Sequence, residues 1–321
     1  MRAAVVDRYG PPEVVRVAEV ARPVPRAGEV LVRVEAVAVT SADARIRGAR
    51  FPSGFGVFAR LAFGVVRPRR KVLGGAFSGV VVESAAEGFT AGDEVSGMTG
   101  VRFGAHAEYV AVSAARVARK PAAVRHDDAA ALLFGGGTAL HYLRDKGSLA
   151  AGMSVLVNGA SGAVGTNAVQ LAKYFGAAVT GVTSARNADL VRGLGADHVI
   201  DYADGGLVRT TDRFDLVLDT VGTLSIASGR RLLTDRGRLL LAVAGLGDTI
   251  RARGNVAAGP APERAADFAF LLDLAAQAKI VAVIDATYGL DDVVTAYKRV
   301  DSGRKVGNIV LRPARNPPET P

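Results

Sequence analysis

The segment VNGASGAVG, residues 157–165, constrains the fold of this chain more than any other stretch. The apolar run SVLVN leads into it and the helically spaced run TNAVQLAKYFG leads out, so it joins a strand to a helix. In such a turn Gly159 permits a tight change of direction, Gly162 lets a pyrophosphate approach the backbone, and Gly165 lets the helix pack closely. Unpaired N–H groups at the start of the helix attract the anion. The segment predicts a dinucleotide-binding turn, the alternative being a glycine-rich turn of structural use only.

Strands and helices alternate along the chain after this turn. The predicted strands cover 154–158, 177–183, 198–202, 215–222 and 238–245, and the predicted helices between them cover 163–175 and 188–195. Alternation of this kind is typical of a parallel sheet covered by helices on both faces. The region is therefore predicted to be α/β.

The flanking regions have a different character. The first 120 or so residues are mostly strand-like, with Val-rich runs at 29–40, 77–85 and 107–113. The run AALLFGGGTALHYLRDKG, residues 130–147, is expected to form a helix, a break and a second helix. An amphipathic helix is expected over 262–279, followed by a strand, a short helix and a final strand up to Arg312. We therefore expect two domains: residues 1–122 rejoined by 283–321, and residues 123–282.

The end of the second predicted strand indicates which dinucleotide is preferred. NAD sites place an Asp or Glu there to bind the ribose 2′-hydroxyl, whereas this strand ends TGVTSARN without an acid. Ser184 and Arg186 stand there instead, and a hydroxyl and a guanidinium would hold a 2′-phosphate. Tyr202, at the end of the third strand, could reach the same phosphate. NADPH is therefore predicted over NADH, unless Arg186 is a solvated surface residue and Tyr202 only a strand-end tyrosine.

Composition excludes several classes of site. The chain has no cysteine, which excludes disulfides, thiolate chemistry and zinc sites that need sulfur. The four histidines are scattered without ligand spacing, so no metal is expected. The N-terminus is predicted to be a strand rather than a secretory signal, and no apolar run is long enough to span a membrane, so we expect a soluble, cytoplasmic protein without a membrane partner.

The basic charge favours an anionic ligand. The net charge is +9, yet the only dense cluster is RPRRK, residues 67–71, which has no interleaved aromatics. Nucleic acid is therefore not expected as the main partner.

Six segments occur in order along the chain: GDEVSG, GAHAEYV, GGGTALHYL, VLVNGASGAVGTNAVQLAK, GADHVIDY and GRKVGNIVL. Together they resemble the zinc-independent quinone oxidoreductase branch of the medium-chain dehydrogenase/reductase superfamily, over nearly the whole length. The resemblance implies an α/β fold with a GroES-like, β-rich catalytic domain and a Rossmann domain with a doubly wound parallel sheet. It also implies NADPH, a small-molecule quinone or enone substrate, and a homodimer or homotetramer.

The resemblance also implies, position by position, which residues contact the cofactor in addition to the three glycines. The set is Ser161, Ala163 and Val164 at the pyrophosphate; Ser184, Arg186 and Tyr202 at the 2′-phosphate; Thr138 beside the nicotinamide; Ala244 and Leu246 at the nicotinamide ribose; and Asn308 in the final strand, where the family often has lysine.

The zinc ligands of related dehydrogenases have no counterpart under this resemblance. The stretch G-V-C-x-x-D becomes AVTSAD, with Thr40 at the Cys position and Asp43 kept, and Gly75 and Ala76 replace His-Glu. Zinc-free members usually have Asn and Pro where this chain has Thr40 and Ser41, so the substrate range stays open.

A hydride acceptor that no metal polarises must already be activated, as quinones and enones are. The protein then needs to supply position and hydrogen-bond donors. Thr40 and Ser41 are candidate donors and Tyr142 is a candidate proton source, but no catalytic acid is assigned. Residues 45–64 are expected to give apolar walls, unless they form a helical hairpin packed on the core, and RPRRK is expected at the rim, where it would attract a phosphorylated or CoA-like substrate.

Two alternative functions remain open at this stage. The changes at Thr40, Gly75 and Ala76 also fit an enoyl reductase dedicated to one biosynthetic substrate. The basic charge also fits a nucleotide-binding protein with little turnover and an RNA-binding or structural role. The sequence does not separate quinone reduction from enone reduction.

Overall fold

The computed structural model describes residues 1–203 and 205–313, and the chain divides into two compact units. The first unit consists of residues 1–51, 56–134 and the chain from Glu263 onward, and the second of residues 52–55 and 135–262. The second unit is thus an insertion in the first. The last eight residues of the predicted C-terminal return, 314–321, lie outside the described residues.

The first unit is built mainly of strands. Its elements are β1 (Arg2–Val6), η1 (Pro12–Val14), β2 (Val15–Glu19), β3 (Glu29–Val39), α1 (Ser41–Arg47), α2 (Gly56–Phe63), β4 (Ala76–Ser84), β5 (Glu94–Met98), η2 (Gly100–Arg102), β6 (Tyr109–Ser113), η3 (Ala114–Arg116), β7 (Val117–Arg119), most of α3 (His126–Leu140), α9 (Ala265–Ala276), β14 (Ile284–Gly289), η6 (Leu290–Asp292), α10 (Val293–Asp301) and β15 (Asn308–Arg312). Within the described residues, one sheet has the order β14-β15-β3-β4-β5-β7 with β6 also on β3, and β1 pairs with β2 separately.

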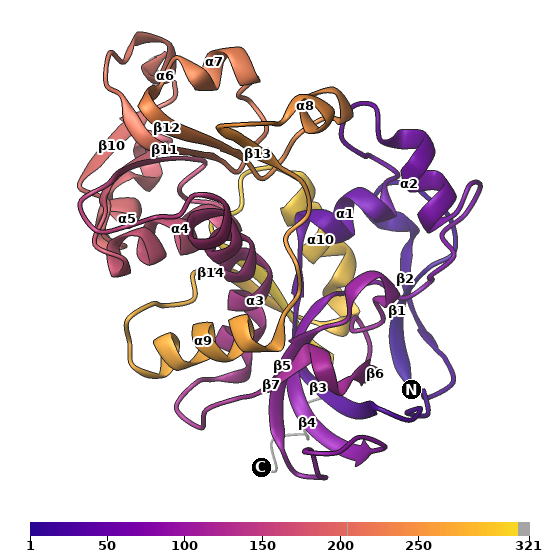
Figure 1. Ribbon diagram of the computed structural model, residues 1–321. Helices are drawn as coiled ribbons and strands as arrows, with labels where there is room; N and C mark the ends of the chain where they lie inside the picture. The colour runs from indigo at the N-terminus through magenta and orange to yellow at the C-terminus, as the bar shows by residue number, and fades with distance from the viewer. Residues whose placement is uncertain (204, 314–321) are drawn as a thin grey trace. The chain divides into compact units, whose positions relative to one another are not determined.

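The long strand β3 is the centre of this unit. Its Val-rich sequence is buried along nearly its whole length, and it pairs antiparallel with β4, β6 and β15. Ile309 of β15 lies opposite Val39, so residues near the end of the chain complete a sheet begun near its start. Helix α10 likewise packs beside α1, as the yellow and indigo ribbons of Figure 1 show.

The second unit alternates strands and helices. Its elements are the end of α3, the π-helical turn η4 (His141–Lys146), β8 (Ser154–Asn158), α4 (Ala163–Tyr174), β9 (Ala178–Thr183), η5 (Ala185–Asn187), α5 (Ala188–Gly193), β10 (His198–Asp201), α6 (Gly206–Arg209), β11 (Phe214–Asp219), α7 (Ile226–Arg230), β12 (Leu233–Leu241), α8 (Leu246–Arg251) and β13 (Val256–Ala258). In the part of the chain that the structure describes, its strands form a parallel sheet in the order β10-β9-β8-β11-β12-β13 (Figure 1).

This strand order reverses at β8, which is the doubly wound, Rossmann-type arrangement. The apolar runs predicted as strands are buried because helices cover the sheet, and Leu156, Val217 and Leu239 meet in one core cluster. The predicted α/β fold with a doubly wound parallel sheet is therefore confirmed.

The predicted break in the run 130–147 is wrong. Helix α3 continues without interruption through Gly135, Gly136 and Gly137 as far as Leu140. A Cβ at Gly135 would lie 2.2 Å from the carbonyl oxygen of Ala163, so glycine lets α3 lie directly against the start of α4. This tertiary packing outweighs the low helix propensity of glycine.

Candidate functional site

The glycine turn has the geometry expected of a dinucleotide-binding turn. β8 ends at Asn158, and Gly159 follows with φ +86°, a conformation that favours glycine. The N–H groups of Gly159 and Ala160 donate to the carbonyl oxygen of Val182 at 3.1 and 2.9 Å, which fixes the turn against β9. A Cβ at Gly165 would lie 2.0 Å from the Gly159 oxygen, so only glycine allows α4 to begin this close to the turn.

The N-terminus of α4 is open. Gly162 is its N-cap and no side chain caps the helix. A Cβ at Gly162 would meet nothing nearer than the Gly159 oxygen at 3.4 Å, an ordinary contact distance, so the protein does not crowd this position. Ala163 and Val164 are partly buried in the first turn, where backbone N–H groups have no acceptor within the helix. These features fit a bound diphosphate.

The predicted residues of the adenosine end gather at the carboxyl ends of β8, β9 and β10. The Ser161 hydroxyl accepts hydrogen bonds from Thr183 Oγ1 at 2.8 Å and Asn187 Nδ2 at 3.2 Å. Ser184 follows β9 and is partly buried, and Arg186 is exposed in η5. Tyr202, with 62% of its surface exposed, follows β10 and donates its N–H to the carbonyl oxygen of Thr183 at 3.2 Å. The structure therefore brings these residues to one edge of the sheet.

Two carboxylates that the sequence analysis missed shape this edge. Asp201, at the end of β10, accepts from the N–H groups of Ala185 at 3.1 Å and Ala203 at 2.9 Å. Asp219, fully buried at the end of β11, accepts from Asn158 Nδ2 and from backbone N–H groups of residues 221, 222 and 224. The signal in the sequence was an acid at the end of a strand, in HVIDY for Asp201 and in DLVLD for Asp219. Both carboxylates hold loops in place.

The other predicted contacts of the second unit lie on separate elements. Thr138 is partly buried near the end of α3. Ala244 follows β12 and packs against the core, and Leu246 begins α8 with its N–H donating to the Ser53 oxygen at 2.8 Å. Residues 52–55 therefore lie against the loop that follows β12.

Tyr142 does not have the surroundings of a proton donor to a ligand. Only 1% of its surface is exposed, and its hydroxyl lies 3.0 Å from the carbonyl oxygen of Leu241 and 2.6 Å from that of Gly259. Burial raises the pKa of Tyr142 to about 12. Its one proton is engaged by backbone carbonyls, so Tyr142 ties η4 to β12 and the chain after β13.

In the first unit, Thr40 and Asp43 form a buried capping box at the start of α1. The Thr40 hydroxyl donates to Asp43 Oδ2 at 2.6 Å and accepts from the Asp43 N–H at 3.2 Å. Asp43 Oδ1 also accepts from the Gly74 N–H at 3.0 Å. Ser41, the first residue of α1, is exposed. Thr40 is thus engaged within the protein, and Ser41 is the more accessible of the two hydroxyls.

Asn308, the remaining predicted contact, begins β15 and is buried. Its side-chain amide donates to the carbonyl oxygen of Val283 at 3.1 Å, and its backbone N–H donates to the same oxygen at 2.9 Å. In this position it joins β15 to the chain before β14.

The most deeply buried histidine has a defined protonation pattern. His106 Nε2 lies 3.2 Å from the Ala38 carbonyl oxygen, which can only accept, so this nitrogen carries the proton. Nδ1 then accepts from the Tyr297 hydroxyl at 3.3 Å. Burial lowers the pKa of His106, against the opposing effect of Asp43. His106 is therefore a neutral residue of the core.

Two family descriptions match the chain. The "Alcohol dehydrogenase GroES-like domain" matches residues 26–122, and the "Zinc-binding dehydrogenase" family matches residues 194–311. The 2-methylene-furan-3-one reductase of Solanum lycopersicum is 30% identical over 332 residues, covering 98% of this chain and 79% of that protein. The chain belongs to the medium-chain dehydrogenase/reductase superfamily. Both the predicted superfamily and the GroES-like first domain are confirmed.

Further comparisons place this superfamily member in the quinone oxidoreductase branch. The quinone oxidoreductase from Coxiella burnetii superposes with a TM-score of 0.88 at 26% identity, covering 98% of this chain and 99% of that one. A mycobacterial protein solved with NADPH has a TM-score of 0.81 at 26% identity, covering 98% of this chain and all of that one (100%).

The relative from Danio rerio, the mitochondrial NAD(P)H oxidoreductase RTN4IP1, is 35% identical over 242 residues. That match covers 69% of this chain but only 61% of the relative, so the chain spans less than two thirds of it.

Membership in this superfamily does not by itself fix metal content or location. Among residues 1–203 and 205–313, no three His, Cys, Asp or Glu side chains lie together as metal ligands would. Over the same residues, no helix has the length and apolar character needed to cross a bilayer. The absence of a metal, the cytoplasmic location and the homodimer or homotetramer stay predictions.

Proposed function

We propose that this protein is an NADPH-dependent oxidoreductase that transfers a hydride to a quinone or an α,β-unsaturated carbonyl without a metal. The observation that carries the proposal is the open N-terminus of α4 behind Gly159 and Gly162, next to a β9 end that bears Ser184 and Arg186 but no carboxylate. Relatives named as a quinone oxidoreductase, a 2-methylene-furan-3-one reductase and a protein in complex with NADPH support it.

The residues of the second unit would hold the cofactor in three places. Backbone N–H groups of Ala163 and Val164 would bind the diphosphate, and the hydroxyl of Ser161 would assist. Ser184, Arg186 and Tyr202 would bind the 2′-phosphate, where a guanidinium offers charge-assisted hydrogen bonds. Bound NADPH supplies the hydride.

The first unit would bind the acceptor. Because the Thr40 proton is engaged by Asp43, Ser41 is the hydroxyl that we assign to the acceptor oxygen. A hydrogen bond to that oxygen stabilises the negative charge that arrives with the hydride.

The test is a spectrophotometric panel of quinones and enones, each with NADPH and with NADH. We expect oxidation of NADPH with at least one acceptor class, and weaker activity with NADH. Tight NADPH binding without turnover on any acceptor, together with salt-sensitive RNA affinity, would instead support the nucleotide-binding alternative. Activity on one enoyl substrate alone would support the dedicated enoyl reductase.

A further inference from the structure

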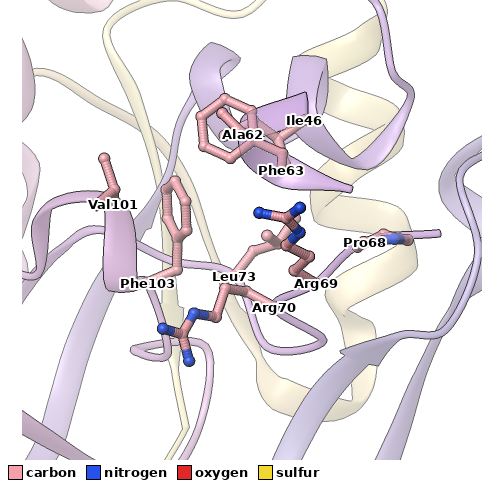
Figure 2. A pocket seen from close by; sticks show the side chains of 9 residues that line it. All are labelled: Ile46, Ala62, Phe63, Pro68, Arg69, Arg70, Leu73, Val101 and Phe103. Atoms are coloured by element: carbon pink, nitrogen blue, oxygen red, sulfur yellow. The ribbon is translucent and has the colours of Figure 1, made fainter. Parts of the chain in front are cut away.

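A cavity of about 310 Å³ is lined entirely by residues of the first unit (Figure 2). It is formed where α1, α2, the RPRRK segment, η2 and the residue after η2 come together. Ile46, Phe63, Leu73 and Phe103 give it apolar walls, and Arg69 and Arg70 line it as well. Its volume falls within the usual range for small-molecule sites, roughly 300–1,000 Å³.

The apolar side of the cavity is built on the core. Ile46 and Leu73 are buried, and the Phe63 ring stacks on Phe51 with centroids 6.0 Å apart. The rings of Phe63 and Phe103 are also 6.0 Å apart and tilted by 57°. Phe103 holds φ +52° and ψ −156°, which a residue with a side chain rarely adopts. A strained backbone of this kind is retained where the surroundings impose it, often at binding sites.

The polar side of the cavity carries uncompensated positive charge. Arg69 and Arg70 are both exposed. Within the described residues, no carboxylate forms an ion pair with either of them. Their neighbour Lys71, by contrast, pairs with Asp7 at 3.0 Å. The Arg69 N–H donates to the Phe63 carbonyl oxygen at 2.7 Å, which fixes this segment against the end of α2. In Figure 2 the Arg69 guanidinium lies among the lining side chains, below Phe63, and the Arg70 guanidinium extends outward past the base of Phe103.

We propose that this cavity binds an amphipathic anion, with an aromatic or alkyl body against Phe63 and Phe103 and a carboxylate or phosphate on Arg69 and Arg70. A guanidinium fork matches either anion in geometry and charge. As a binding site, the cavity does not depend on hydride transfer. The further statement that this anion is the substrate class rests on the proposed function.

The test measures binding without turnover, by calorimetric titration of the full-length protein with 2-naphthoate and with its neutral analogue 2-naphthamide. We expect 2-naphthoate to bind at least tenfold more tightly, and less tightly as salt is raised. Arg69→Gln with Arg70→Gln should remove that preference and leave 2-naphthamide within twofold. Arg67→Gln is the matched control, since Arg67 lies in the same segment but does not line the cavity, and it should change neither affinity. Ala62→Phe, which fills the cavity, should weaken both ligands.

Several outcomes would overturn the proposal. Equal affinity for the two ligands, or equal loss with Arg67→Gln, would show that the cavity does not select an anion. Loss of 2-naphthoate binding at saturating NADPH in every variant would place the ligand at the nucleotide site instead.

The exposed Val57, Phe58 and Leu61 of α2 require one more experiment, which tests a lipid surface as the source of the anion. Co-sedimentation with phosphatidylglycerol vesicles that is lost in Phe58→Ser would identify the anion source as a lipid surface. A protein that binds 2-naphthoate in this way but reduces no acceptor would disprove the proposed function and leave the site standing.

Discussion

Carboxylates at the strand ends of the second unit, such as Asp201, accept hydrogen bonds from backbone N–H groups. Asp201 accepts from the N–H groups of Ala185 and Ala203, which flank the proposed 2′-phosphate residues. Its negative charge is therefore satisfied by the loops, and the cofactor would meet Ser184 and Arg186. Under the proposed function, selectivity for the nucleotide would therefore rest on Ser184 and Arg186, within three residues of the end of β9, together with Tyr202.

Arg186→Asp tests this assignment. Replacing the guanidinium by a carboxylate removes a charge-assisted hydrogen bond, worth roughly 1.5–3 kcal/mol, and adds repulsion of the 2′-phosphate. We expect the KM for NADPH to rise by at least about tenfold and that for NADH to change much less. Steady-state kinetics with both cofactors measure the ratio.

Arg192→Asp is the matched control, because it makes the same change of charge at a different place. Arg192 lies on α5 and pairs with Asp189. It should leave the cofactor ratio unchanged. An equal rise in the KM for NADPH and for NADH in the Arg186 variant would contradict the assigned phosphate pocket.

The buried imidazole of His106 makes stability depend on pH. Burial lowers the pKa of His106 in the folded protein. As pH falls below about 6.5, the histidine is therefore protonated in the unfolded chain but still neutral in the folded one. The contribution of neutral His106 to folding stability is therefore present above that pH, and it is lost as pH falls towards the pKa of His106 in the folded protein. We expect the wild type to lose about 1 kcal/mol more than His106→Gln between about pH 7.5 and 5.5.

Urea unfolding at the two pH values measures this difference, and NMR titration of the wild-type ring checks it independently. His198→Gln, at an exposed position, should follow the wild-type slope. A His106 ring that titrates near its ordinary pKa in the folded protein would rule out this explanation.

At the scale of elements, the junction of β8 and α4 separates two uses of glycine. Gly165 is needed for packing, since its Cβ would lie 2.0 Å from a backbone oxygen, whereas a Cβ at Gly162 would lie at an ordinary contact distance, 3.4 Å from the Gly159 oxygen. Gly165→Ala should cost about 1–3 kcal/mol of stability through overpacking. Gly162→Ala should keep the melting temperature but weaken NADPH binding by about tenfold or more, because the added methyl stands where the diphosphate approaches.

Differential scanning fluorimetry and NADPH titration distinguish the two variants. The reverse result, with Gly162→Ala unfolding and Gly165→Ala binding normally, would show that the roles are interchanged.

The sequence was sufficient for elements whose pattern is local. The strands β8 to β11 and the helix α4 were predictable from apolar runs and glycine spacing, whereas Ser161, Ala163 and Val164 beside the turn were named through the family resemblance. The unbroken α3 was not, because Gly135 contacts Ala163, which is distant in the sequence. The hydrogen bonds of Asp201 and Asp219, the burial of Tyr142 and the cavity beside Phe103 depend on chain segments that only folding brings together.

At the scale of the whole molecule, the sheet and the core of the second unit come from one continuous stretch of chain. Its parallel sheet and the core cluster around Leu156, Val217 and Leu239 use only residues between 135 and 262. The first unit, by contrast, needs β15 from the far end of the chain.

We therefore expect residues 135–262 alone to unfold cooperatively in urea, as followed by far-UV circular dichroism. Residues 1–134 alone should show no cooperative transition, because β3 lacks its partner β15 and α1 lacks α10. A cooperative transition of residues 1–134 would mean that the C-terminal strands add little to this unit.

The pairing of Ile309 with Val39 also has a consequence for synthesis of the protein. Chains leave the ribosome N-terminus first, so the second unit is fully synthesised before β15, the partner of the last residues of β3, has been made. The second unit, which is translated after most of the first, can therefore complete its sheet before the first unit does. During this interval the unpaired part of the strand edge is open to aggregation.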